Sequence, residues 1–362
     1  MRVEADVSGA VEDRRAVLER MRAVLDRLGH TGFTESGPPA GSGEPWPALT
    51  AAAVSDDVLR RPAAVEAVHM AQRALRSDLS AREPRAALAA VLDRLAGEGP
   101  SAFGPAPPQD HLRRSVSRAL RSIPARRGVD GSPVTAGVVA WDADQRQVLV
   151  RAVGLLTEAW PEMTGELTET VTEVALLDGD AIDGFTDFTV HGAVLVHRNR
   201  LTASASGLPG PVRCAEALVH EGTHNRCNAA AVAGPFLLPE PTEDHPDRAG
   251  GPGPAGDPAG TGDPGGSGRP APGALLVDTP LRADPRPLSG LLQQTVVLAR
   301  SVLLYRRLAA LGTVGRAVAA REARLVASAR QAVDTLTAHS GALTDGGRAL
   351  LGECAAVAQG RP

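Results

Sequence analysis

The 362-residue chain has few aromatic residues, few cysteines and no excess of positive charge. Aromatic residues make up 2% of the sequence, and alanine, valine and leucine supply most of its apolar content, a composition that favours helix over sheet. The net charge of −4 excludes a global basic field of the kind that attracts nucleic acid or anionic lipid. The three cysteines are too few and too scattered for a disulfide framework; they are Cys214, Cys227 and Cys354.

Long apolar runs are also missing from the sequence. No stretch reaches the roughly 18 apolar residues of a membrane helix, and the first residues, MRVEADVSGAVEDRR, lack the apolar segment of a secretory signal. Hydrophobic residues nevertheless make up 43% of the chain, which is enough for a sizeable core. We therefore expect a folded, cytoplasmic protein with no membrane and no nucleic-acid partner.

Apolar residues recur at helical spacing over most of the chain. The predicted fold class is mainly α with a small β element of two or three strands. Residues 184–201, GFTDFTVHGAVLVHRNRL, predict a strand pair around Gly192, because they are rich in β-branched and aromatic residues. His191 and His197 in this segment are interpreted as structural, although His191 is kept as a candidate site residue. Helices are expected at 10–29, 48–78, 83–97, 110–122, 143–163, 167–177, 211–233, 287–311, 313–338 and 345–358.

Two regions are predicted along the chain, an N-terminal helical region (1–125) and a HExxH domain (126–362), which is named for the motif described next. Inside the second region, residues 238–272 contain nine prolines and nine glycines among 35 residues. Such a composition cannot bury enough apolar surface to offset its ordering entropy, so this segment is predicted to be a disordered insertion. His245, which lies in it, is not counted as a ligand.

The segment CAEALVHEGTHNRCNAA, residues 214–230, contains the motif His-Glu-x-x-His. In a helix, His220 and His224 project from one face at a separation that a single metal ion can bridge. Glu221 is rotated by about 100° and reaches a metal-bound water rather than the ion. Pro211 suits the first turn of such a helix, and the residues after it are largely apolar. The motif therefore predicts a metal helix with His220 and His224 as ligands, packed against a second long helix.

Steps of four residues give a polar stripe on this helix, formed by Glu216, His220, His224 and Asn228. Buried polar groups need partners, and a metal ion would be the partner of the two histidines. Glu216 and Asn228 are predicted to orient those histidines by hydrogen bonding. Cys227 lies about 10 Å along the helix axis from His220 and is interpreted as a core residue.

A zinc peptidase would need a third protein ligand, with Glu221 acting as general base. A metzincin would continue His-x-x-Gly-x-x-His, whereas this chain continues HNRCNAAAVAG, which excludes that class. A gluzincin would take a glutamate from a later helix, and the candidates are Glu322 and Glu353. The sequence around Glu322, REAR, is more typical of a solvated helix face.

A second motif follows the Pro/Gly-rich segment, in VDTPLRADPRPLSGLLQQTVVLARSVLLYRRL (277–308). Arg282 and Arg286 bracket the residues ADP, and Pro287 then begins a long apolar helix. Two arginines in a rigid turn are suited to the bidentate capture of a carboxylate, and they are equally compatible with salt bridges on a surface turn.

Together, AEALVHEGTHNRCNA and TPLRADPRPLSGLLQ resemble the bacterial HExxH-motif domain family associated with ribosomally synthesised peptide natural products. The resemblance covers roughly residues 185–310, and LTDGGRALL (343–351) is also similar to that family. It implies an oxidoreductase, an iron(II)- and 2-oxoglutarate-dependent dioxygenase that hydroxylates a side-chain β-carbon of a precursor peptide. His220 and His224 would hold the iron, and Arg282 and Arg286 are candidates for binding the carboxylate of 2-oxoglutarate. The implied partners are the precursor peptide and other peptide-modifying enzymes.

The chain departs from the family pattern where a further histidine is common, on the helix after the arginine segment. The corresponding positions here are Gln293 and Leu298. We predict that Gln293 completes the metal site through its amide oxygen, with His191 or an acidic residue as alternatives. Three hypotheses follow: the iron oxygenase, a zinc metallopeptidase with Glu221 as general base, and a non-catalytic relative that binds a peptide or another modifying enzyme.

Overall fold

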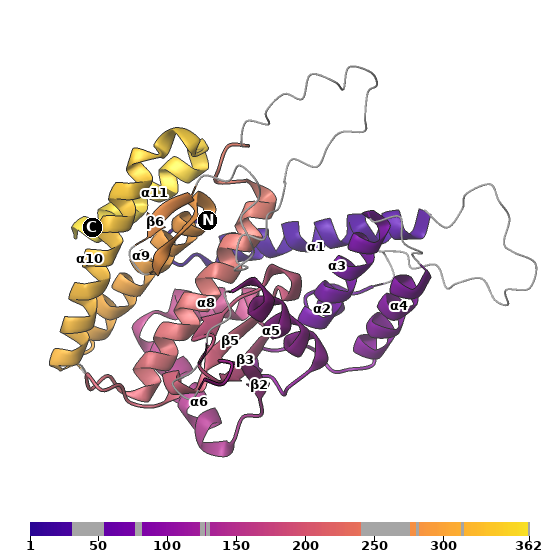
Figure 1. The fold of residues 1–362 in the computed structure, drawn as a ribbon, viewed down its shortest axis with the longest axis horizontal. Coiled ribbons are helices and arrows are strands. Elements are labelled where there is room, and N and C mark those ends of the chain that lie inside the picture. The colour runs from indigo at the N-terminus through magenta and orange to yellow at the C-terminus, as the bar shows by residue number, and fades with distance from the viewer. Residues whose placement is uncertain are drawn as a thin grey trace, which may run out of the picture.

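The computed structural model describes residues 1–30, 54–76, 82–123, 127, 131–239, 276–279, 282–312 and 315–360 (Figure 1). Helices dominate these residues and are accompanied by a small sheet, which confirms the predicted mainly α fold class. The helices are α1 (Val7–His30), α2 (Asp56–Leu59), α3 (Pro62–Arg76), α4 (Arg82–Ala96), α5 (Asp110–Ser122), α6 (Ala143–Ala159), α7 (Pro161–Thr170), α8 (Gly210–Ala233), α9 (Leu288–Ala310), α10 (Arg316–Ala338) and α11 (Asp345–Gln359).

The β structure is larger than the two or three strands expected. Five strands form one sheet in the order β1-β3-β5-β4, with β2 pairing antiparallel to β3, and a separate hairpin joins β6 to β7. The helix expected at 167–177 was wrong in its second half, which forms β3. A short apolar run in a buried strand cannot be distinguished from helix by periodicity alone. The strands are β1 (Gly104–Pro105), β2 (Gly137–Val139), β3 (Glu173–Asp178), β4 (Gly184–Phe185), β5 (Ala193–His197), β6 (Leu276–Thr279) and β7 (Arg282–Pro287).

The two central strands, β3 and β5, run parallel and are buried on both faces. Side chains alternate between the faces of a strand, and the two sets here belong to different cores. Val174 and Leu176 join a core with α6, α7 and α8, whereas Ala175 and Leu177 join a core with α5. Helices therefore cover both sides of the sheet, which explains why its central strands are continuously apolar.

The strand pair predicted within 184–201 is present, because β4 pairs antiparallel with β5. Gly192 adopts φ 95°, a left-handed conformation that favours glycine, immediately before β5. His191 and His197 are both buried in this segment. His197 accepts a hydrogen bond from the backbone N–H of Asn199 at 3.1 Å through Nδ1, and its Nε2 donates to the carbonyl of Gly179 at 2.8 Å. Both ring nitrogens of His197 are thus bonded within the fold, as expected for a structural residue.

Helix α8 runs through the middle of the molecule and contacts elements from both predicted regions (Figure 1). It packs so closely on α7 that a Cβ at Gly222 would lie 2.2 Å from Cδ2 of Leu167. Two turns further along the helix, Ala229 belongs to the core of the N-terminal helices α1 to α4. The predicted region boundary at residue 125 is crossed by further contacts, since β1 pairs with β3 and Val3 lies in the main core.

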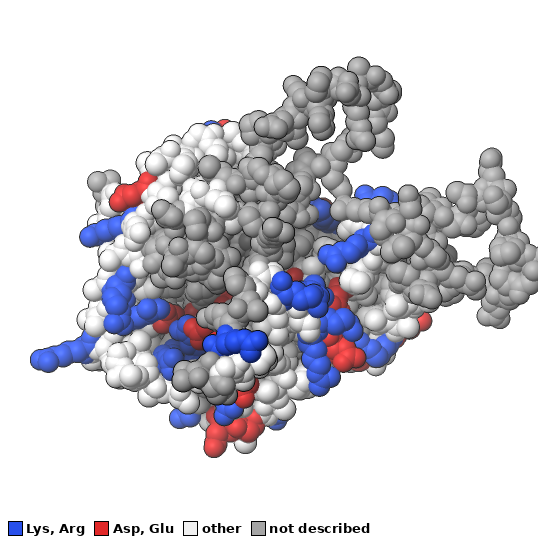
Figure 2. Space-filling view, in the orientation of Figure 1, with Lys and Arg blue, Asp and Glu red and all other residues white. Residues whose placement is uncertain are grey.

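Helix α9 is long and apolar enough to cross a membrane by length and composition, but 83% of that stretch is buried inside the protein. Such burial is the ordinary property of a core helix. The insertion predicted at 238–272 lies outside the described residues except for Leu238 and Pro239. Arginine and acidic side chains are interspersed over the described part of the face shown in Figure 2.

Candidate metal centre

His220 and His224 lie on consecutive turns of α8, as the motif predicts. Their ring centroids are 5.1 Å apart with an interplanar angle of 60°. The His220 side chain keeps 37% of its accessible surface, although the helix around it is almost entirely buried. The helix therefore presents two neighbouring imidazoles to a solvent-accessible space while the rest of its surface is packed.

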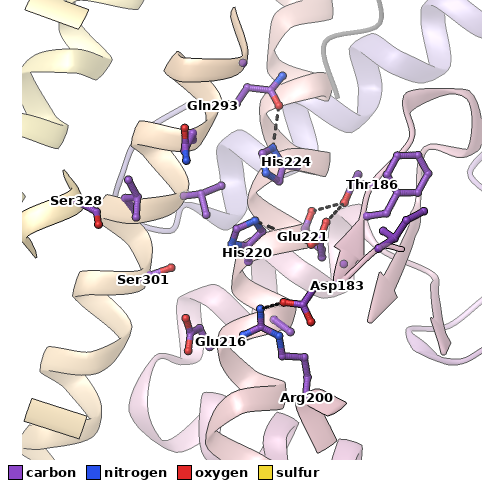
Figure 3. Close-up of a pocket in the computed structure, with 18 of the residues that line it drawn as sticks. Asp183, Thr186, Arg200, Glu216, His220, Glu221, His224, Gln293, Ser301 and Ser328 are labelled. Atoms are coloured by element: carbon purple, nitrogen blue, oxygen red, sulfur yellow. Dashed lines mark hydrogen bonds and ion pairs between the residues drawn. The ribbon is translucent and has the colours of Figure 1, made fainter. Parts of the chain in front are cut away.

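That space is a cavity of about 530 Å³. It is lined by α8, α9 and residues 182–186, and α5 and α10 complete the wall. Figure 3 shows the two histidines facing α9 across this space, with the β4 region on the opposite side. A volume of this size falls in the range of small-molecule sites.

Gln293 on α9 contacts His224 directly. Its amide oxygen accepts a hydrogen bond from Nδ1 of His224 at 2.9 Å, and its Nε2 donates to Oδ1 of Asn228 at 2.9 Å (Figure 3). With a proton on Nδ1, the lone pair of His224 resides on Nε2, which is the form that binds a metal ion. The oxygen that was predicted to bind the metal is thus engaged with His224, and Gln293 orients this ring. Asn228 supports it one step further away.

Glu221 is held by residues of β4 and its extension. Oγ1 of Thr186 donates to Oε2 of Glu221 at 2.7 Å, and Oε1 lies 4.0 Å from Nε2 of His220. The carboxylate fits against Gly184 so tightly that a Cβ at that glycine would lie 2.4 Å from Oε1. One oxygen is therefore fixed by the hydroxyl while the other is directed toward His220.

Glu216, one turn before His220, is buried between α9 and α10. Tyr305 donates its hydroxyl to Oε2 of Glu216 at 2.6 Å, and Nε of Arg321 donates to Oε1 at 3.1 Å. Burial, followed by the charge of Glu216, raises the pKa of Tyr305, so the phenol stays protonated. Burial alone would lower the pKa of Arg321, but its hydrogen bond and charge interaction with Glu216 raise it above its usual value. Glu216 therefore ties α8 to α9 and α10, and these hydrogen bonds of its carboxylate go to Tyr305 and Arg321 rather than to the histidines that it was predicted to orient.

The other candidates for a third ligand lie away from the cavity. Glu322 pairs with Arg306, and Glu353 accepts a hydrogen bond from the backbone of Val3. His191 lines a separate cavity of about 20 Å³. Among the residues that the structure describes, no group of three or more His, Cys, Asp or Glu side chains is arranged to hold a metal ion.

Two further predictions concern the second motif and the cysteines. Arg282 and Arg286 fall on β7, but their side chains lie outside the described part of the structure. Cys227 is 1% exposed and belongs to the main core, as predicted.

Several residues of the site were not predicted from the sequence. The segment REAR was expected to face solvent, yet Arg321 and Arg324 both line the cavity. Thr186 and Gly184 were expected only as part of a strand pair. The recurrence of Arg321, Leu325 and Ser328 at helical spacing was the one signal that could have placed this face of α10 toward the interior.

No protein-family model matches the chain, and no curated protein matches it, so the resemblance to the HExxH-motif family depends on its short sequence motifs alone.

Proposed function

We propose that this protein is an iron(II)- and 2-oxoglutarate-dependent oxygenase that hydroxylates a peptide side chain. The observation that carries the proposal is the pair of imidazoles that lines the cavity. His220 and His224 face a cavity of about 530 Å³, and Gln293 fixes the tautomer of His224. Two protein donors on one face leave most of the coordination sphere of an ion for a chelating co-substrate and dioxygen.

The donor set fits iron(II). Imidazole is a suitable ligand for iron, and the hydrogen bond from Nδ1 of His224 to Gln293 is the outer contact that metal-binding histidines usually make. The carboxylate of Glu221 lies 4.0 Å from His220 and would contribute negative charge near an ion held by the histidines. Bound together, iron(II), 2-oxoglutarate and dioxygen supply the oxidising equivalents that convert a carbon–hydrogen bond to an alcohol, with succinate and carbon dioxide as co-products.

Residues on different walls of the cavity would have different roles in binding a substrate. Apolar side chains from α5 and the β4 region lie on one wall, namely Ala119, Ile123, Ile182 and Phe185. These can exclude water and receive a peptide side chain. The α9 and α10 walls are more polar and include Gln294, Ser301 and Arg324. A substrate that enters between these walls meets the histidine pair at the α8 wall.

Metal analysis and co-substrate turnover test the proposal. Protein reconstituted with iron(II) without oxygen should bind one ion, and on exposure to oxygen it should convert 2-oxoglutarate to succinate. With a mixed library of synthetic peptides, it should add one oxygen atom to a subset of them. His220→Ala should abolish all three results. If iron binds but no succinate forms under any of these conditions, the oxygenase proposal is wrong. If neither iron nor zinc binds, the non-catalytic peptide-binding hypothesis replaces it.

A zinc hydrolase is the second candidate, and the position of Glu221 favours it. The hydroxyl of Thr186 fixes one carboxylate oxygen and leaves the other near His220, where a general base would accept a proton from a zinc-activated water. Glu221→Gln separates the two functions, since it keeps the size of the side chain and removes the base. Zinc-loaded wild type should cleave the peptide library and the variant should not, whereas an oxygenase should retain most of its 2-oxoglutarate turnover in the variant.

A further inference from the structure

Charged side chains of the cavity wall are mostly paired with one another. Asp183 forms an ion pair with Arg200, as Figure 3 shows, and Glu216 forms one with Arg321. The two opposite charges of each pair compensate each other, so neither pair adds net charge to the wall. Of the remaining charged side chains in the lining, Glu221 lies beside the histidines and Arg324 lies on α10.

Arg324 has no acidic partner among the residues that the structure describes, and its side chain is exposed at the cavity. Most of the other arginines near it are committed: Arg321 to Glu216, Arg306 to Glu322, and Arg330 to the carbonyl of Ala358. A guanidinium carries five donors in a fixed fork that matches a carboxylate. Arg324 is therefore the cation of this wall that is available to a ligand.

Two serines accompany Arg324. Ser328 lies one helical turn further along the same face of α10, and Ser301 lies on the neighbouring part of α9. Figure 3 places both on the wall opposite His220. Hydroxyl groups donate to carboxylate oxygens, so these serines complement the guanidinium. The cavity therefore has arginine and serine donors on one wall and the histidine pair on the opposite wall.

We propose that Arg324, with Ser301 and Ser328, forms a carboxylate-binding subsite across the cavity from His220 and His224. Its ligand is a dicarboxylate or an acidic peptide side chain that spans the cavity. The assignment of this carboxylate to 2-oxoglutarate depends on the proposed function, whereas the subsite itself does not. It is distinct from Arg282 and Arg286, which the second motif nominates for the same chemistry from another segment.

Binding to the metal-free protein tests the subsite without any turnover. Ligand-observed NMR titrations of EDTA-treated protein would use glutarate, which has two carboxylates and no keto group for chelation. A second probe, N-acetyl-glutamate amide, represents an acidic peptide side chain, and the uncharged diamide of glutaric acid is the negative control. Arg324→Gln removes the charge. Arg316→Gln is the matched control, since Arg316 is an exposed arginine at the start of the same helix and does not line the cavity.

We expect Arg324→Gln to weaken glutarate binding about tenfold or more, and Ser328→Ala to weaken it about threefold. The control variant should bind as wild type does. If only the acetylated glutamate is affected, the subsite is supported and its ligand is the peptide. Unchanged affinities in Arg324→Gln, equal losses in Arg316→Gln, or no binding by wild type would each overturn the proposal. A failure of the oxygenase assay would leave these binding results unaffected.

Discussion

Two faces of α8 carry polar side chains, and their surroundings differ. One face presents His220 and His224 to a cavity, with Gln293 behind the second histidine. The opposite face carries Arg226, whose side chain is fully buried and forms ion pairs with Asp13 and Glu166. Side chains on the first face border a cavity, whereas the side chain on the second face contacts other protein side chains.

The second face belongs to a larger ionic cluster that joins distant parts of the chain. Glu166 on α7 also pairs with Arg300 of α9, and Arg300 donates to the backbone carbonyl of Val3 at 3.0 Å. Burial lowers the pKa of Arg226 to about 10, which leaves the guanidinium charged at neutral pH. The comparison indicates that one face of α8 anchors the helix to distant segments, whereas the other face borders the cavity at which we propose that a metal ion binds. Substitutions on the two faces should therefore separate stability from metal binding.

The largest effect is expected for the anchoring face. Arg226→Ala leaves the carboxylates of Asp13 and Glu166 buried with less compensation, so the free energy of unfolding should fall by about 3–5 kcal/mol. Urea denaturation would measure it, with Arg151→Ala, an exposed arginine of α6, changing stability by no more than about 0.5 kcal/mol. Molecules of Arg226→Ala that remain folded should still bind metal. Equal stability of the two variants would contradict the anchoring role.

Replacement of a histidine on the cavity face should lower metal affinity strongly and stability only slightly. His224→Ala removes one of two imidazole donors and should lower metal affinity by about 100-fold or more. Its thermal midpoint without metal should change much less than that of Arg226→Ala, because His224 lies at the cavity. Competition with a chromogenic chelator would measure affinity, and His339→Ala, at the C-terminal end of α10 and away from the cavity, is the control. If His224→Ala binds iron as tightly as wild type, the two-histidine site is wrong.

Substitutions of Gln293 test how much its hydrogen bond to His224 contributes to metal affinity, compared with the two histidines themselves. Gln293→Leu removes the acceptor that fixes the tautomer of His224 and should weaken metal binding by about 10–100-fold. Gln293→Glu keeps an oxygen acceptor and should restore most of the affinity. Gln294→Leu, at the adjacent residue of the same cavity wall, is the matched control. A cobalt(II) absorption spectrum that changes its coordination type in Gln293→Leu would show that Gln293 is itself a ligand.

Helix α8 and its stripe could be predicted from the sequence because helical periodicity is a local property. The four-residue step alone puts Glu216, His220 and His224 on one face of a helix, and that face lines the cavity, while Cys227 lies in the core as expected. Local periodicity also failed at β3, where residues 174–177 are a short buried run that either a helix or a strand can contain. The β element was underestimated for this reason.

The partners of the stripe could not be predicted, because they come from distant parts of the chain. Thr186 reaches Glu221 from the β4 region, and Arg321 reaches Glu216 from a helix more than one hundred residues later. Nothing local distinguishes such residues from those on a solvated face until the tertiary packing is known. Gln293 was located from a family pattern, but its hydrogen bond to His224 depends on how α9 packs against α8.

The smallest effect on metal binding is expected for His191, which lines a separate cavity from the one that His220 and His224 line. Burial, and then the neighbouring His69, lower the pKa of His191 from 6.5 to about 4. Between these two values the unfolded chain binds a proton that the native state does not, so stability falls as pH drops from about 6.5 to 4. His191→Leu should remove a loss on the order of 2 kcal/mol from the difference between unfolding free energies measured at pH 7 and pH 4.5. Metal affinity at pH 7 should be unchanged, because His191 lines a separate small cavity. If His191→Leu instead abolished metal binding and left the pH dependence of stability unchanged, His191 would be part of the metal site with His220 and His224. The distinction between an anchoring face and a metal-binding face of α8 would then be wrong.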